Sequence, residues 1–201
     1  MTYLTELDRW NQRLNLTSVP ATEVWERHVA ESIHLEAVVE IERGAEVIDV
    51  GSGAGLPGIV LAVVRPDVCV SLLEADTRKC GFLTHVAGLL GMPSLRVINC
   101  RAELAARDPV LREQFDAAVS RAAAAAPVLC ELTLPLVRIG GTVAALVSHP
   151  VAAARASARA AELCGGGPPL AREGVLLMTK VAATPERFPR RPGVPGRRPL
   201  V

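Results

Sequence analysis

One stretch decides the fold of this chain: Val47-Ile48-Asp49-Val50-Gly51-Ser52-Gly53-Ala54-Gly55-Leu56. The β-branched residues at its start are typical of a short buried strand, and the glycines that follow predict a sharp turn. Further apolar runs that favour strands lie at residues 68–73, 95–98, 115–120, 141–147 and 175–181. Helical stretches separate these runs, so we predict an α/β fold of the Rossmann-like class, a mostly parallel sheet with helices on both faces.

The glycine turn also predicts a ligand site. In sheets of this kind ligands bind where the strands end, and glycines let the backbone approach them closely. A dinucleotide-binding fingerprint would need glycine at position 56, where this chain has Leu56. The spacing Asp49-x-Gly51-x-Gly53-x-Gly55 instead resembles motif I of class I methyltransferases. In that motif the loop passes beneath the methionine part of S-adenosylmethionine.

A second acid supports a nucleotide-like ligand. Glu74 ends the second predicted strand, 25 positions after Asp49. A carboxylate there can accept hydrogen bonds from both ribose hydroxyls, as does the acid about 20 residues after a dinucleotide loop. The alternative interpretation is an exposed glutamate at a strand end. Together with the glycine spacing, Glu74 favours S-adenosylmethionine over NAD.

The composition fits one Rossmann-like domain with a small helical cap. Half of the 201 residues are hydrophobic and only 3% are aromatic, so the core must be aliphatic. Helical spacing of leucines predicts a cap over residues 1–43, before the methyltransferase-like domain at 44–183. No apolar run reaches the roughly 18 residues of a membrane span and no signal pattern opens the chain, so we expect a cytoplasmic protein that binds no membrane. The five cysteines include no C-x-x-C pair, and we predict no metal.

Residues 184–201 form a basic tail, with five arginines, five prolines and one acid. The prolines predict an extended segment that is ordered only in part. Arginines in such a tail favour contact with a polyanion, although basic tails are often simply solvated. The candidates for RNA contact are Arg187, Arg190, Arg191, Arg197 and Arg198.

Several motifs together resemble one particular family. In chain order they are Asn15-Leu16-Thr17-Ser18, Arg27-His28 with Glu31-Ser32, Asp49 to Gly58, Arg101-Ala102-Glu103, Ser120-Arg121-Ala122 and the tail from Thr184 to Pro195. This set resembles the RsmG (GidB) family over nearly the whole chain. That family methylates N7 of a guanine in small-subunit (16S) ribosomal RNA. The resemblance therefore implies this activity, with S-adenosylmethionine as cofactor and the small ribosomal subunit or its assembly intermediate as partner.

The resemblance also implies roles for individual residues. It assigns the cofactor to Asp49, Gly51, Ser52, Gly53, Gly55, Leu56, Glu74, Ala102, Glu103 and Arg121, with Glu74 at the ribose and Ala102 and Glu103 at the adenine. Guanine N7 is an unprotonated acceptor, so no general base is needed and the enzyme has mainly to align the reactants. Arg121 is the catalytic candidate, because it could donate to guanine O6 or to a phosphate; alternatively it is a structural ion-pair partner.

Two positions depart from the family pattern. Ser148 stands where the family usually has lysine, and Glu31 replaces the more usual aspartate. His28 and Glu31 share a face of a predicted helix, as a ligand-facing pair or as a packing pair. The alternatives are a class I methyltransferase that acts on another RNA or a small molecule, and a catalytically weakened RNA-binding paralogue.

Overall fold

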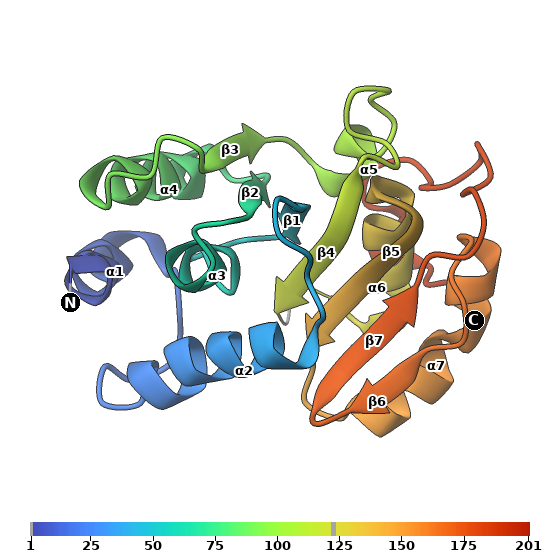
Figure 1. Ribbon diagram of the computed structural model, residues 1–201, viewed down its shortest axis with the longest axis horizontal. Helices are drawn as coiled ribbons and strands as arrows, with labels where there is room; N and C mark the ends of the chain where they lie inside the picture. Colours follow the sequence, from blue (N-terminus) through green and yellow to red (C-terminus); the bar gives the residue numbers. More distant parts are fainter. Residues whose placement is uncertain (1, 122–123) are drawn as a thin grey trace.

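The computed structural model describes residues 2–121 and 124–201, which fold around a seven-stranded sheet with strand order β3-β2-β1-β4-β5-β7-β6 (Figure 1). The strands are β1 Glu46–Val50, β2 Cys69–Glu74, β3 Arg96–Asn99, β4 Phe115–Arg121, β5 Val137–Leu146, β6 Leu170–Arg172 and β7 Val175–Thr179. The first five pair in parallel, whereas β7 runs antiparallel to both β5 and β6. The predicted mostly parallel α/β fold is confirmed. The exposed edge strand β6 was not predicted, because it has no buried apolar face.

Helices cover both faces of the sheet. One face carries α1 Thr2–Leu14, the π-helix Trp25–Ala30, α2 Glu31–Val38, α3 Gly58–Val64 and α4 Thr77–Leu89. The other carries α5 Ala102–Ala105, α6 Ala126–Thr133, the 3-10 turn Leu134–Leu136 and α7 Pro150–Leu163. Because side chains alternate across a strand, Val47 packs in the first core and Ile48 in the second.

Local sequence signals explain where these elements begin and end. The Asp76 side chain accepts a hydrogen bond from the Arg78 backbone N–H at 2.8 Å and caps α4. Gly91 follows α4 with a φ of 65°, a left-handed conformation that suits glycine. The acidic cap and the glycine stop thus set the two ends of α4.

The C-terminal segment corrects one prediction. Residues 184–201 do not extend freely; they pack against the second core, where Phe188 and Pro189 are buried and the short helix α8 Val194–Arg197 contacts α6 (Figure 1). The Arg112 guanidinium donates to four backbone carbonyls, those of Ala106, Thr184, Pro185 and Phe188. The proline-rich composition predicted an extended segment because composition does not show which distant side chains hold a chain in place.

The described residues contain neither a membrane-spanning helix nor a metal-binding cluster. Within residues 2–121 and 124–201, no helix is both long and apolar enough to cross a membrane. The same residues contain no group of three or more His, Cys, Asp or Glu side chains arranged to hold a metal ion.

Candidate functional site

The glycine turn after β1 is held by backbone hydrogen bonds. The N–H groups of Gly51 and Ser52 both donate to the Leu73 carbonyl, at 2.9 and 3.1 Å. Three glycines of the turn, Gly51, Gly53 and Gly55, have φ values of 74°, 55° and 89°. Such values are open to glycine at little cost, so the predicted spacing reflects a turn that other residues would strain.

Gly53 and Gly55 serve different purposes in this turn. A Cβ on Gly55 would lie 2.2 Å from Ile59 Cδ1, so this glycine allows α3 to pack closely. A Cβ on Gly53 would meet no closer neighbour than the Gly51 carbonyl at 3.8 Å, and Gly53 lines an open cleft. Gly55 therefore supports the turn from below, while Gly53 faces the cleft, and the predicted cofactor contact of Gly55 stays a prediction.

Asp49 also lies beneath the cleft, not among its described lining residues. It is fully buried, and its Oδ2 accepts a hydrogen bond from the Gly58 backbone N–H at 3.0 Å. Its Oδ1 is the one buried side-chain polar atom of the described residues without a hydrogen-bond partner. Burial raises the pKa of this carboxyl to about 7. Asp49 thus supports the turn from beneath, and its predicted contact with the cofactor stays a prediction.

Glu74 joins the glycine turn to the end of β2. Its Oε2 accepts from the Gly53 backbone N–H at 2.9 Å and its Oε1 from the Asp76 backbone N–H at 2.8 Å. Each carboxylate oxygen has two lone pairs, so both can still accept a hydrogen bond from a ligand. Glu74 lines the cleft, at the place where the sequence predicted a ribose-binding acid.

The cleft itself has a volume of about 590 Å³ and lies at the carboxyl ends of the strands. Its lining includes eight of the ten predicted cofactor residues, namely Gly51, Ser52, Gly53, Leu56, Glu74, Ala102, Glu103 and Arg121. The far wall comes from the C-terminal segment, through Gly193, Pro195 and Gly196. The Glu103 carboxylate accepts a hydrogen bond from the Gly193 backbone N–H at 2.8 Å and so attaches this wall to α5. The sequence did not predict a contribution of the tail to the cleft.

Arg121, at the end of β4, lines this cleft and also a second cavity of about 850 Å³. Its Nη1 donates to the Arg27 carbonyl at 2.6 Å and contacts His28 Nδ1, and it lies 3.7 Å from Glu31 Oε2. The structure therefore brings together the predicted catalytic candidate and the His28–Glu31 pair. Ala122, the last residue of the Ser-Arg-Ala element, lies outside the described residues.

The second cavity is formed largely by the helical cap. The described residues that line it include Asn15, Thr17, Ser18, Arg27, His28, Glu31 and Ser148. His28 Nε2 lies 2.7 Å from Thr17 Oγ1, and burial together with the charge of Arg121 lowers the pKa of His28. His28 Nδ1 also lies 2.9 Å from the Arg27 carbonyl, so His28, Arg27 and Arg121 meet at one point. His28 thus holds the guanidinium at the junction of the two cavities.

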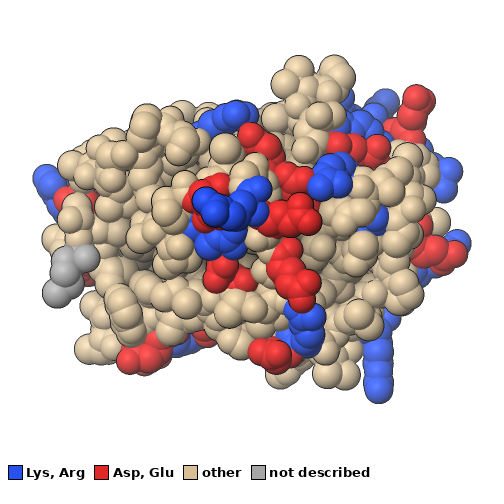
Figure 2. Space-filling model, in the orientation of Figure 1, with Lys and Arg blue, Asp and Glu red and all other residues tan. Residues whose placement is uncertain are grey.

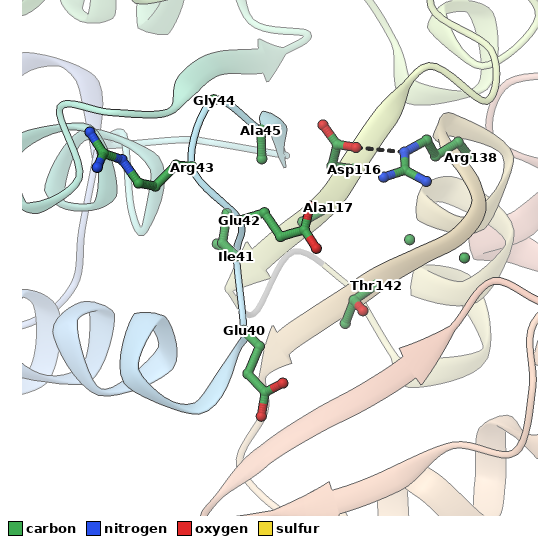
Figure 3. A pocket seen from close by; sticks show the side chains of 12 residues that line it. Glu40, Ile41, Glu42, Arg43, Gly44, Ala45, Asp116, Ala117, Arg138 and Thr142 are labelled. Atoms are coloured by element: carbon green, nitrogen blue, oxygen red, sulfur yellow. Dashed lines mark hydrogen bonds and ion pairs between the residues drawn. The ribbon is translucent and has the colours of Figure 1, made fainter.

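A third cavity, of about 320 Å³, lies at the amino ends of β1 and β4, opposite the carboxyl ends that border the cleft (Figure 3). It is lined by residues that precede or open the strands, among them Glu42, Ala45 and Asp116. Asp116 pairs with Arg138 and accepts from the Glu46 backbone N–H, so its carboxylate has a structural role. Figure 2 shows acidic and basic side chains intermixed at the middle of the molecular face that is viewed in Figure 1. None of the sequence-predicted site residues lines this cavity.

The tail arginines separate into two groups. Arg190 forms an ion pair with the fully buried Glu131, at 2.6 Å between Nη2 and Oε2, and its Nε and backbone N–H also donate to that carboxylate. We therefore remove Arg190 from the RNA-binding candidates, because its guanidinium is already engaged. The other four, Arg187, Arg191, Arg197 and Arg198, are exposed. Sequence reasoning missed Glu131, whose signal is a single acid within an apolar helix.

The model of the GidB family, described as rRNA small subunit methyltransferase G, matches residues 1–166. The chain belongs to this family. The Ribosomal RNA small subunit methyltransferase G of Moorella thermoacetica is 39% identical over 203 residues, which cover 95% of this chain and 85% of that protein. The protein of the same name from Roseiflexus castenholzii is 38% identical over 210 residues, which cover 99% and 89%.

A solved structure supports the fold of this GidB-family protein. TrmN from Thermus thermophilus superposes with a TM-score of 0.56 at 18% sequence identity, over 83% of this chain and 55% of that chain. At such low identity the likeness shows a shared fold and nothing about substrate. The sequence-based assignment to the RsmG (GidB) family and to the class I methyltransferase fold is confirmed by these comparisons.

Proposed function

We propose that this protein transfers a methyl group from S-adenosylmethionine to N7 of a guanine in small-subunit (16S) ribosomal RNA. The observation that carries the proposal is the position of Arg121, which borders both the cleft beside the glycine turn and the cavity beneath the cap. Two adjoining sites that share one cationic side chain suit a reaction between two ligands. Membership of the GidB family supports the same activity.

The cleft suits a nucleoside cofactor. Its volume of about 590 Å³ falls within the roughly 300–1,000 Å³ that is usual for small-molecule sites. Gly51, Gly53 and Leu56 would lie against the ligand, Glu74 would accept from its ribose hydroxyls, and Ala102 would lie at its adenine. S-adenosylmethionine supplies a methyl group activated by a positively charged sulfur.

The chain's own residues then have to position the base. Guanine N7 carries a free lone pair, so the reaction needs no proton acceptor and depends on alignment. Arg121 is fixed through its Nη1 by the Arg27 carbonyl and by His28, and its Nη2 also lies 3.4 Å from His28 Nε2, which leaves Nε and the second Nη2 hydrogen for a ligand. A cation held in this way can donate to the base or to its phosphate.

The partner is a polyanion, and the exposed arginines of the C-terminal segment suit it. Arg187, Arg191, Arg197 and Arg198 are exposed, and the segment that carries them forms a wall of the cleft. Phosphate contacts near the cleft would position RNA without reading its sequence. A ribosomal substrate would place the activity in the cytoplasm.

The experiment that tests the proposal is transfer of labelled methyl from S-adenosylmethionine to small subunits isolated from a strain that lacks this gene. Cleavage chemistry specific for N7-methylguanine then locates the product. We expect a single labelled guanine in the small-subunit RNA. Label in another position of the base, or no label in a protein that binds the cofactor by calorimetry, would refute the proposal.

A further inference from the structure

We propose that Glu31 and Arg121 together recognise the target guanine, with Arg121 donating to O6 and Glu31 accepting from N1–H and the 2-amino group. The inference rests on the proposed function and deepens it, because it assigns the determinant of base specificity. It also gives Glu31 a role that the helical spacing alone left open.

The two side chains are neighbours in the cavity beneath the cap. Arg121 Nη1 lies 3.7 Å from Glu31 Oε2, and both residues line the same space of about 850 Å³. The side chain of Glu31 is 49% exposed while that of Arg121 is 18% exposed. The pair is therefore loose, and the carboxylate remains free to accept hydrogen bonds from a ligand.

The arginine is held by two residues of the cap, Arg27 and His28, that line the same cavity. Its Nη1 donates to the Arg27 carbonyl at 2.6 Å and contacts His28 Nδ1, whereas Nη2 is a distant 3.4 Å from His28 Nε2. A guanidinium has five N–H donors in one plane, so fixing one end orients the others. The contacts of Nη1 therefore limit the orientations in which the remaining donors can meet a ligand.

The donor and acceptor pattern of this pair suits guanine and opposes adenine. On the guanine ring, O6 accepts and the adjacent N1 and 2-amino groups donate, so they require a neighbouring donor and acceptor. Adenine has the reverse pattern, with an amino group at position 6 and a lone pair at N1. Adenine would place a donor against the guanidinium and an acceptor against the carboxylate, and mismatched buried polar groups of this kind cost affinity.

The same arrangement directs N7 toward the cleft. In guanine, N7 lies on the side of O6 away from N1. If Glu31 accepts from N1–H and Arg121 donates to O6, N7 lies on the side of Arg121 that is away from Glu31. Arg121 is also a lining residue of the cleft beside the glycine turn, which is where the methyl donor would bind. Recognition and alignment thus follow from one pair of side chains.

The first experiment measures base selectivity without turnover. Ligand-observed NMR would follow GMP, IMP and AMP binding to the protein saturated with S-adenosylhomocysteine. IMP lacks the 2-amino group, so we expect the order GMP, IMP, AMP for the parent protein and loss of this order in Glu31→Gln. No preference for GMP over AMP in the parent, no GMP contact at all, or an unchanged order in the variant would overturn the inference.

The second experiment measures transfer to small subunits. We expect Glu31→Gln to lower kcat/KM by about 10- to 100-fold, the usual effect of losing hydrogen bonds to a charged group. Glu31→Asp keeps the carboxylate and should retain most activity. Glu26→Gln is the matched control, because Glu26 is exposed on the neighbouring turn and does not line the cavity. Cofactor affinity by calorimetry should be equal in all four proteins.

The two proposals can fail separately. If the parent protein binds the cofactor but methylates no guanine in the small subunit, the proposed function fails, whatever the NMR shows. If the parent methylates guanine and Glu31→Gln does so equally well, the assignment of Glu31 fails while the function stands.

Discussion

Replacement of Arg190 by alanine tests how the C-terminal segment is attached to the body. Arg190 donates to the fully buried Glu131 from its backbone N–H, from Nε at 2.9 Å and from Nη2 at 2.6 Å. The alanine variant keeps only the backbone donor. It therefore leaves a buried carboxylate without its counter-charge.

The expected loss of stability is large. Removing one partner of a buried ion pair typically costs about 3–5 kcal/mol, because the remaining charge stays desolvated. For a protein of this size about 1 kcal/mol corresponds to a change of about 2–4 °C in Tm. Together these values predict a decrease in Tm of about 6–20 °C. The Arg190→Lys variant keeps the charge but loses the two-pronged geometry, so its loss should be smaller.

Thermal and urea unfolding followed by circular dichroism would measure the effect. A double mutant, Arg190→Ala with Glu131→Leu, removes both charges and should recover much of the loss. A decrease for Arg190→Ala of less than about 0.5 kcal/mol, the range of ordinary surface substitutions, would refute the attachment. The salt dependence of RNA binding should be the same as in the parent, because this arginine is not available to phosphate.

Further outcomes follow from the same structure. Gly53→Val should abolish cofactor binding, measured by calorimetry, because the valine side chain would enter the cleft. Gly55→Ala should chiefly lower Tm, because the new Cβ would clash with Ile59. Equal effects of the two variants on cofactor affinity and on Tm would contradict their separate roles. Arg121→Ala should lower methyl transfer about 10²-fold, as expected for lost alignment, with cofactor affinity nearly unchanged, and normal turnover on saturating subunits would exclude the role given to it. Burial raises the pKa of Asp49 from 3.8 to about 7, so between these pH values the folded state binds a proton that the unfolded chain releases. The stability that this group contributes is therefore present below about pH 4 and is lost as the pH rises through about 7. Asp49→Asn should flatten the dependence of the free energy of unfolding on pH, measured in urea titrations. If Arg191 contacts a phosphate, Arg191→Ala should reduce the slope of log RNA affinity against log salt concentration by about 1. An unchanged slope would show that Arg191 is solvated and makes no phosphate contact.

The glycine turn shows how much of the site the sequence could predict. The spacing of glycines after a β-branched run predicted both the turn and the cleft beside it, because such turns depend on local backbone conformation. The spacing could not tell that Gly53 faces the cleft whereas Asp49 and Gly55 lie beneath it. Which side of a loop faces a cavity depends on the helix packed against it, here α3 through Ile59.

The C-terminal segment shows what local patterns miss. Its prolines and arginines gave a composition that is typical of extended chains, whereas its attachment depends on Arg112 and Glu131. Glu131 is 59 positions from Arg190 in the chain, so no periodicity connects the two. The same limit applies to the cavity beneath the cap, where Arg121 and His28 are 93 positions apart. The family resemblance named both residues in its motifs but did not place them in one site.

The shared wall between the two cavities has a thermodynamic consequence. Arg121 and Leu16 line both, so a ligand in either one changes the surroundings of the other. Binding free energies in such a pair are coupled, and the coupling is reciprocal: whatever factor the cofactor contributes to RNA affinity, RNA contributes to cofactor affinity. If S-adenosylmethionine occupies the cleft, loss of its methyl group would remove the positive charge on its sulfur, and the methylated base would gain one. The coupling between the products would then differ from the coupling between the reactants.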